Sequence, residues 1–283
     1  MKATIFLRLV IVLTLFGCRK DSNTDIVTQD LESAGGFGLY WDHEIFTTEG
    51  RCVRFEFSDT RRLSNYYTLK FDYTIKGHDL LIRLVSKADQ GKCHHFSGES
   101  DTLCTSSGLL IIPDRLLQTG TYNMTLKTSN FEVKSKLLVD NEKITLTIPT
   151  NDYFTCYIKT VYPIPANLLM AQVVYSGSQN TASANSFFND LKTFGLTERK
   201  LPNYHYRHLT VDDNGNAINS DWPPDNHLLA FNYTMSRSFK DIFNLAKQDF
   251  NKYNMNIYLF SSNGDEARLS KTDGINVRYA GEK

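Results

Sequence analysis

Between residues 37 and 162, apolar and polar positions alternate in short runs separated by turn-forming residues. The run from Cys52 to Phe57 alternates in this way, and so does the run from Tyr67 to Ile75. A period of two turns one face of a strand toward a core and the other toward solvent. Many short strands at close spacing, without a helical period, predict an antiparallel β-sandwich over residues 37–162.

One short segment in this region adds a likeness to a known domain type. The step Gly120-Thr121-Tyr122 resembles the Gly-x-Tyr entry to a late strand of immunoglobulin-like and related accessory domains. This three-residue resemblance implies an immunoglobulin-like arrangement of the sandwich.

The pattern changes near residue 163, where Pro163-Ile164-Pro165 begins a stiff connector over residues 163–167. Each proline fixes its own φ and biases the preceding residue toward extended structure. The following residues predict strands over 168–175, 204–211, 228–234 and 256–261, with a further edge strand over 274–279.

Two amphipathic helices are expected among these strands. Ser183 is expected to begin the first helix and Gly195 to end it, while Ser238 with Asp241 forms a capping-box-like start for the second. The resulting order β-α-β-β-α-β, with each helix apolar on one side only, predicts a ferredoxin-like α+β domain over residues 168–283.

The N-terminal residues predict export. A positive start is followed by an apolar stretch too short to cross a bilayer. The segment Leu15-Phe16-Gly17-Cys18 resembles the lipobox of Gram-negative bacterial lipoproteins. That resemblance implies removal of signal peptide 1–17 and attachment of lipid to the Cys18 sulfur. The alternative is an ordinary signal peptide, with Cys18 the first residue of a soluble secreted protein.

Residues 18–36 are polar and contain several turn-formers, so we expect a flexible tether. Arg19 occupies the position after the lipid-bearing cysteine, where aspartate tends to retain lipoproteins in the inner membrane. The lipoprotein pattern therefore implies the outer membrane, with the periplasmic or outer orientation left open.

Charge narrows the classes of partner. The chain has 31 basic and 31 acidic residues, and loss of Lys2 and Arg8 with the signal peptide leaves a net charge of −2. Such a body lacks the positive field that nucleic-acid binding normally uses, so no nucleic-acid partner is expected.

Four cysteines follow Cys18, and an exported protein meets an oxidising compartment. They are Cys52, Cys93, Cys104 and Cys156. Three pairings are possible. We favour Cys93–Cys104 with Cys52–Cys156, in which the long bridge would stabilise the domain by about 4–5 kcal/mol. A zinc or copper site using Cys93, His94, His95 and Cys104 is the alternative, although export favours a disulfide and no metal is expected.

Other polar groups favour structural roles. Asp212 to Asn216 superficially resembles a calcium loop, but Ala217 and Pro223 stand where glycine and a bidentate carboxylate are needed, so we expect a turn. His205 and His208 fall on opposite faces of a strand. His43, which stands beside Trp41, Asp42 and Glu44, could line a site, but the favoured interpretation places it at the entry to the first strand.

Motifs for nucleophilic catalysis, zinc proteolysis, dinucleotide binding and phosphate binding do not occur in the sequence. We therefore assign no catalytic residue and expect no cofactor.

Aromatic pairs are the remaining candidates for a binding face. Tyr204 with Tyr206, and Phe231 with Tyr233, are spaced by two residues and share a face in each strand. Such rings can stack on sugars or peptides, although filling a core is the favoured alternative.

The leading hypothesis is a non-enzymatic envelope lipoprotein for binding or assembly. Its partners would be the membrane, through the lipid on Cys18, and envelope proteins or glycans. The alternative is a hydrolase of envelope or extracellular polymers using acidic residues assembled at the domain interface. A third possibility is a subunit that polymerises by strand exchange.

Overall fold

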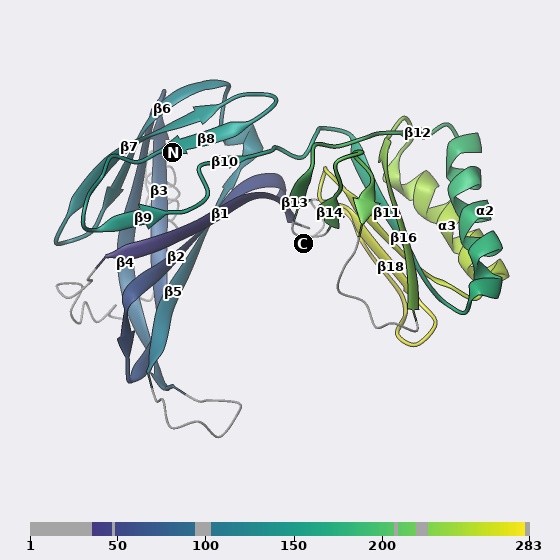
Figure 1. Ribbon diagram of the computed structural model, residues 1–283, viewed down its shortest axis with the longest axis horizontal. Helices are drawn as coiled ribbons and strands as arrows, with labels where there is room; N and C mark the ends of the chain where they lie inside the picture. The colour runs from purple at the N-terminus through teal and green to yellow at the C-terminus, as the bar shows by residue number, and fades with distance from the viewer. Residues whose placement is uncertain (1–35, 47–48, 94–102, 207–208, 219–225, 281–283) are drawn as a thin grey trace, which may run out of the picture. The chain divides into compact units, whose positions relative to one another are not determined.

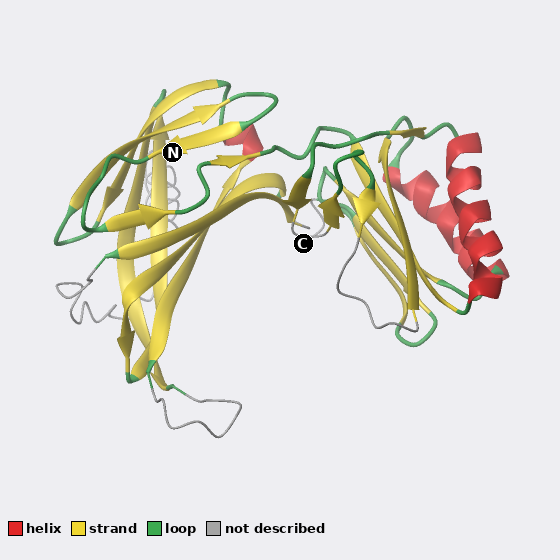
Figure 2. Ribbon diagram, viewed as in Figure 1, coloured by secondary structure: helices red, strands yellow, loops and turns green. Residues whose placement is uncertain are grey.

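The computed structural model describes residues 36–46, 49–93, 103–206, 209–218 and 226–280. These residues form a mostly β structure with one large curled sheet, two smaller sheets and two α-helices (Figures 1 and 2). The predicted signal peptide, Cys18 and the tether up to residue 35 lie outside the described residues. None of the helices within the described ranges is long and apolar enough to cross a membrane.

The large sheet contains ten strands. They are β1 (Phe37–Phe46), β2 (Gly50–Leu63), β3 (Asn65–Lys76), β4 (Asp79–Lys92), β5 (Cys104–Pro113), β6 (Gly120–Lys127), β7 (Glu132–Val139), β8 (Ile144–Thr147), β9 (Phe154–Cys156) and β10 (Thr160–Val161). Their order is β10-β8-β7-β6-β4-β3-β5-β2-β1-β9. The two edge strands are close neighbours in sequence, as expected for a sheet that curls around one core.

Three pairings in this sheet are parallel, namely β1–β9, β3–β5 and β4–β6. Only Ser64 separates β2 from β3, and β5 lies between these two strands, antiparallel to β2 and parallel to β3. Gly108 permits the close approach, since a β-carbon at this position would overlap the carbonyl of Leu69. The strands thus form one continuous mixed sheet.

The predicted alternation matches the observed burial in this region. Every second residue of β7 is buried, and β3 and β4 are joined by a two-residue turn in which Gly77 has a φ of 57°. The inward residues form one core that includes Trp41, Phe55 and Phe57. This core fixes the frame from which the polar residues described below project.

The second sheet has six strands. They are β11 (Leu168–Ser176), β12 (Thr197–Glu198), β16 (Asn226–Thr234), β17 (Asn256–Ser261), β18 (Glu266–Ser270) and β19 (Gly274–Arg278), in the order β12-β16-β11-β17-β18-β19. Helices α2 (Thr181–Thr193) and α3 (Phe239–Lys252) lie side by side on one face of this sheet (Figure 2). Their buried rings, among them Phe187 and Phe250, pack on the inward side of β11 and β17.

The helix ends match the sequence prediction in part. The backbone N–H of Asp241 donates to the Ser238 hydroxyl at 3.2 Å, so the predicted start of α3 is confirmed. Gly195, with a φ of 101°, ends the first helix as predicted. Ser183, however, does not cap α2, because a preceding 3-10 turn at Ser178–Asn180 leads directly into a helix that begins at Thr181.

The predicted strand over residues 204–211 is wrong. Its residues form β13 (Tyr204–Tyr206) and β14 (Leu209–Val211), which join β15 (Ala217–Ile218) in a separate three-stranded sheet. The turn at Asp212–Asn216 folds β14 back on β15, so β14 pairs with its sequence neighbours, and β12 takes the place beside β16. A third apolar cluster includes Tyr206 and Val211 together with Ile164 of the connector.

Candidate functional site

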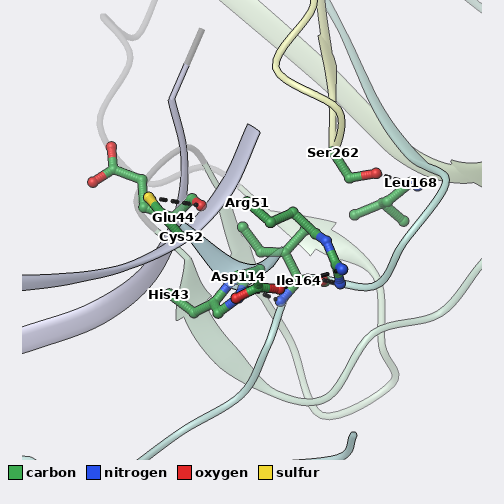
Figure 3. Close-up of polar contacts among 8 residues, drawn as sticks. All are labelled: His43, Glu44, Arg51, Cys52, Asp114, Ile164, Leu168 and Ser262. Carbon is green, nitrogen blue, oxygen red and sulfur yellow. Dashed lines mark hydrogen bonds and ion pairs between the residues drawn. The ribbon is translucent and has the colours of Figure 1, made fainter. Parts of the chain in front are cut away.

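Three charged or ionisable side chains meet beside the connector. His43 extends from β1, Arg51 lies next to Gly50 at the start of β2, and Asp114 follows the last residue of β5. The pairing of β1 with β2, and of β2 with β5, brings these distant sequence positions together. Figure 3 shows the three side chains converging on Ile164.

His43 is fully buried and uses both ring nitrogens. Its Nε2 lies 2.8 Å from Asp114 Oδ1, and the backbone N–H of Ile164 donates to its Nδ1 at 3.1 Å. Because Nδ1 accepts a hydrogen bond, it carries no proton, and the ring is assigned as the neutral tautomer that donates from Nε2 to Asp114.

Arg51 completes the contact with the connector. Its guanidinium lies 3.3 Å from Asp114 Oδ2 and donates to the carbonyl of Ile164 at 2.9 Å. Proline has no backbone N–H, so Ile164 carries the only one in Pro163-Ile164-Pro165. Both backbone polar groups of Ile164 are therefore bound by this network, which we call the connector clamp (His43, Arg51, Asp114 and the Ile164 backbone).

The electrostatics of Asp114 favour its charged form. Burial would raise the pKa of its carboxyl group, but the hydrogen bond from His43 and the charge of Arg51 outweigh that effect and hold the pKa below its ordinary value. The clamp therefore contains a carboxylate at neutral pH, matched by one guanidinium.

A cavity of about 360 Å³ lies beside the clamp. Its lining combines polar groups with the apolar connector. The lining residues are Arg51, Asp114, Leu117, Thr119, Val139, Asp140, Asn141, Ile144, Pro163, Ile164, Pro165, Ala166 and Arg199. We call this the clamp cavity. Guanidinium, amide, hydroxyl and carboxylate groups in one hollow suit the recognition of a polar ligand.

The thiol next to the clamp is not a nucleophile. Cys52 is fully buried and donates to the carbonyl of Glu44 at 3.5 Å. Burial, reinforced by nearby carboxylates including those of Glu44 and Asp114, raises the pKa of the Cys52 thiol well above its ordinary value. The thiol therefore stays protonated at neutral pH.

The predicted disulfide between Cys52 and Cys156 is wrong, because both thiols are free. Cys52 lies opposite Glu44 of β1, whereas Cys156 lies opposite Leu39 of the same strand. Five residues along a strand span roughly 16 Å, which is far beyond the reach of a disulfide.

The predicted disulfide between Cys93 and Cys104 is confirmed, with a Cα–Cα distance of 5.9 Å. It joins the end of β4 to the start of β5. Both sulfurs are thereby removed from the alternative metal site, whose His94 and His95 lie outside the described residues. Within the described ranges, no group of three His, Cys, Asp or Glu side chains is placed to hold a metal ion.

The aromatic candidates lie in two different cores. Tyr206 is 1% exposed and belongs to the third cluster, where Tyr204 packs edge-on against it at 5.1 Å between ring centroids. Tyr233 is fully buried beneath the helices, and the half-buried Phe231 packs on Phe188 at 4.6 Å. The four rings therefore form no common exposed face.

The remaining polar candidates have local roles. The side chain of Asp212 accepts backbone N–H groups from Asn214 and Asn216, so the predicted turn is confirmed. His205 Nδ1 lies 2.7 Å from the Thr210 hydroxyl on the paired strand. His208 lies outside the residues that the structure describes.

Asp42 and Glu44 were noted beside His43 in the sequence, but a buried carboxylate cluster with Arg54 was not predicted. Asp42 and Glu44, each 3% exposed, extend from one face of β1 and share Arg54 of β2 with Glu56. The spacing of 42 and 44 indicated a shared face, but the register that places Arg54 opposite Asp42 was not visible in the sequence.

Arg51, Asp114 and Arg199 were not singled out. They belong to segments far apart in the chain, and only the folded sheet brings the first two together. No protein-family model, curated protein or solved structure matches this chain. Its function is therefore inferred from the residues themselves.

Proposed function

We propose that this protein is a lipid-anchored lipoprotein of the Gram-negative outer membrane whose body is a non-enzymatic binding module. The lipobox-like segment Leu15-Phe16-Gly17-Cys18 supports the anchor. Each buried methylene of an attached acyl chain contributes about 0.8 kcal/mol, and two or more chains give stable attachment.

The disulfide supports the proposed compartment. Cys93 and Cys104 form a bridge between two strand ends, and structural disulfides are typical of exported proteins because the cytosol keeps thiols reduced. The bridge and the lipobox-like segment are independent features of the chain, and both favour export.

The clamp cavity is the observation that carries the binding role. Arg51 is held by Asp114 and by the Ile164 carbonyl, so its position is fixed before any ligand arrives. The neighbouring prolines restrict the cavity wall in the same way. A preformed hollow with a few fixed polar groups is typical of a ligand site.

We further propose a two-module body, with residues 37–162 and 168–283 as separate domains after tether 18–36. The partial strand order β17-β11-β16-β12, with a helix after β11 and another after β16, supports a ferredoxin-like second module. Alternating burial around one core supports an immunoglobulin-like first module, although its parallel pairings depart from that pattern.

The carboxylate cluster does not favour the hydrolase alternative. A general acid or nucleophile must reach its substrate, but Asp42 and Glu44 are each 3% exposed and share the charge of Arg54. We therefore assign this cluster a role in pairing β1 with β2.

Cell fractionation of a Cys18→Ala variant tests the anchor. We expect the variant in the soluble fraction and the native protein in the membrane fraction, because the acyl chains attach to the Cys18 sulfur. A Cys156→Ala variant is the matched control, since it removes a different thiol and should stay with the membrane. If the Cys18→Ala protein also remained in the membrane fraction, lipid anchoring at this residue would be disproved.

A further inference from the structure

We propose that the clamp cavity binds an acidic sugar residue, with the sugar carboxylate recognised by Arg51 and Arg199. This inference rests on the proposed binding role and names the ligand class. Both arginines line the cavity, as do Thr119, Asp140 and Asn141. The sugar carboxylate would meet the guanidinium groups, and the sugar hydroxyls would meet the uncharged polar side chains.

Several hydrogen-bond donors of the cavity have no partner among the described residues. Both oxygens of Asp114 are engaged, one by His43 and the other by Arg51. A guanidinium has five N–H groups, and the described contacts of Arg51 use only two of its nitrogens. Arg199 is exposed and its side chain has no ion pair with any residue that the structure describes. Such a donor-rich site favours a ligand rich in acceptors.

The lining carries two arginines and two aspartates, and their contacts decide which charged group is open to a ligand. Arg51 and Asp114 match each other's charge, so Arg51 can offer a ligand only its remaining N–H groups, and one oxygen of Asp140 accepts the backbone N–H of Glu142 at 2.9 Å. Among the described residues, no hydrogen bond or ion pair uses the guanidinium of Arg199, so this group is the one that would meet an anion. A planar carboxylate fits the fork of a guanidinium through two parallel hydrogen bonds, and such charge-assisted bonds are stronger than neutral ones.

The remaining wall favours a sugar ring over a bare anion. Pro163 and Pro165, which are partly exposed, form an apolar side against which the C–H groups of a sugar ring can pack. A volume of about 360 Å³ lies within the range of small-molecule sites. A lone carboxylate would leave this side of the cavity without contact.

Saturation-transfer NMR on the purified protein in detergent tests the ligand class with three probes. Glucuronic acid carries both ring and carboxylate, glucose lacks the carboxylate, and acetate lacks the ring. We expect binding of glucuronic acid with a Kd on the order of 1 mM, the range typical of a ligand of this size. Glucose and acetate should each bind at least about tenfold more weakly, because each lacks one set of contacts.

An Arg199→Gln variant tests the site. Because Arg199 is exposed, we expect the variant to fold and its Kd for glucuronic acid to rise at least about tenfold. Arg278→Gln, at an exposed arginine of β19 that does not line the cavity, is the matched control and should bind as the native protein does. Thermal melting of both variants verifies folding, and Asn141→Ala provides a second cavity variant.

Two outcomes would overturn the inference. If the Arg199→Gln variant bound glucuronic acid with unchanged affinity, the ligand would not bind in the clamp cavity. If acetate or glucose bound as tightly as glucuronic acid, an acidic sugar would not be the preferred ligand class. Loss of glucuronic acid binding leaves membrane attachment through Cys18 intact, so this failure is distinguishable from a failure of the proposed anchor.

Discussion

At the scale of single residues, the connector clamp shows how the members of a polar network offset one another's cost of burial. A buried imidazole or carboxylate is costly unless its hydrogen bonds are made. His43 and Asp114 satisfy each other, and the backbone of Ile164 occupies the second ring nitrogen. Because each member fills a bonding position of its neighbour, loss of one member leaves the others unsatisfied.

An Asp114→Asn variant should lower the free energy of unfolding by about 2 kcal/mol at pH 7, because Arg51 and His43 lose a charged acceptor. The folded pKa of Asp114 is depressed, so its contribution is present above the ordinary value of 3.8 and is lost as the pH falls through the folded pKa. The difference between native and variant should therefore shrink below about pH 4. Urea unfolding at pH 7 and pH 3 measures it.

Asp72→Asn provides the control for this experiment. Asp72 also pairs with an arginine, Arg83, at 2.9 Å, but both side chains are exposed. Surface pairs of this kind contribute about 0–1 kcal/mol. A cost for Asp114→Asn no larger than that of the control would contradict a stabilising role for the clamp.

Local sequence signals predicted single residues well where the bonding partners are near in sequence. Ser238 and Asp241 are three residues apart, and Gly77 lies within a two-residue turn. The Cys52–Cys156 pairing failed because loop entropy favours any long bridge, whereas strand register decides whether two sulfurs can meet. The clamp was likewise hidden, since its members come from four separate segments.

At the scale of elements, the two helices carry an electrostatic conflict. Asp249 of α3 is 5% exposed, and Asp190 of α2 faces it. Burial raises the pKa of Asp249 to about 6, and the charge and hydrogen bond of Asp190 add to the increase, while Lys252 partly offsets it. The packing of α2 on α3 therefore makes the charged form of Asp249 costly, and with a pKa of about 6 the carboxyl group is still mostly ionised at neutral pH.

An Asp249→Asn variant should stabilise the protein at neutral pH by about 2 kcal/mol, because asparagine removes the buried charge. The folded pKa of Asp249 lies above the ordinary value of 3.8, so its stabilising effect is full below pH 3.8 and is lost as the pH rises to about 6. The variant should gain most above pH 6 and little near pH 4. Thermal melting at pH 4, 6 and 8 measures this.

The exposed Asp152→Asn change serves as the control and should alter stability by less than about 0.5 kcal/mol at each pH. A gain in Asp249→Asn that did not depend on pH would show that the carboxyl group does not titrate in this range.

The element-scale predictions failed where competing hydrogen bonds decide the pairing. Residues 204–211 alternate as a strand should, but the Asp212 turn supplies β14 with a nearer partner in β15. The two-residue β12 has no alternating pattern to reveal it, and yet it pairs with β16 through Thr197 and Glu198. Amphipathic period identified both helices because each buries one continuous face.

At the scale of the whole molecule, the five cysteines divide into three chemical classes. Cys93 and Cys104 form a disulfide, Cys52 and Cys156 are free, and Cys18 is the proposed lipid carrier. Each class predicts a different response to a thiol reagent, so one titration examines the disulfide pattern and the anchor together.

Thiol titration of the unfolded, unreduced protein should detect two thiols, Cys52 and Cys156, because the proposed lipid would block Cys18 and the bridge blocks the remaining pair. A count of three thiols would show that Cys18 carries no lipid. A count of zero would show that Cys52 and Cys156 form a disulfide after all.

In the folded protein, Cys156 should react before Cys52, because Cys156 is partly exposed. Cys52 is fully buried, and burial raises the pKa of its thiol. Reduction before unfolding should raise the count to four, which verifies that the reagent reaches every unblocked sulfur.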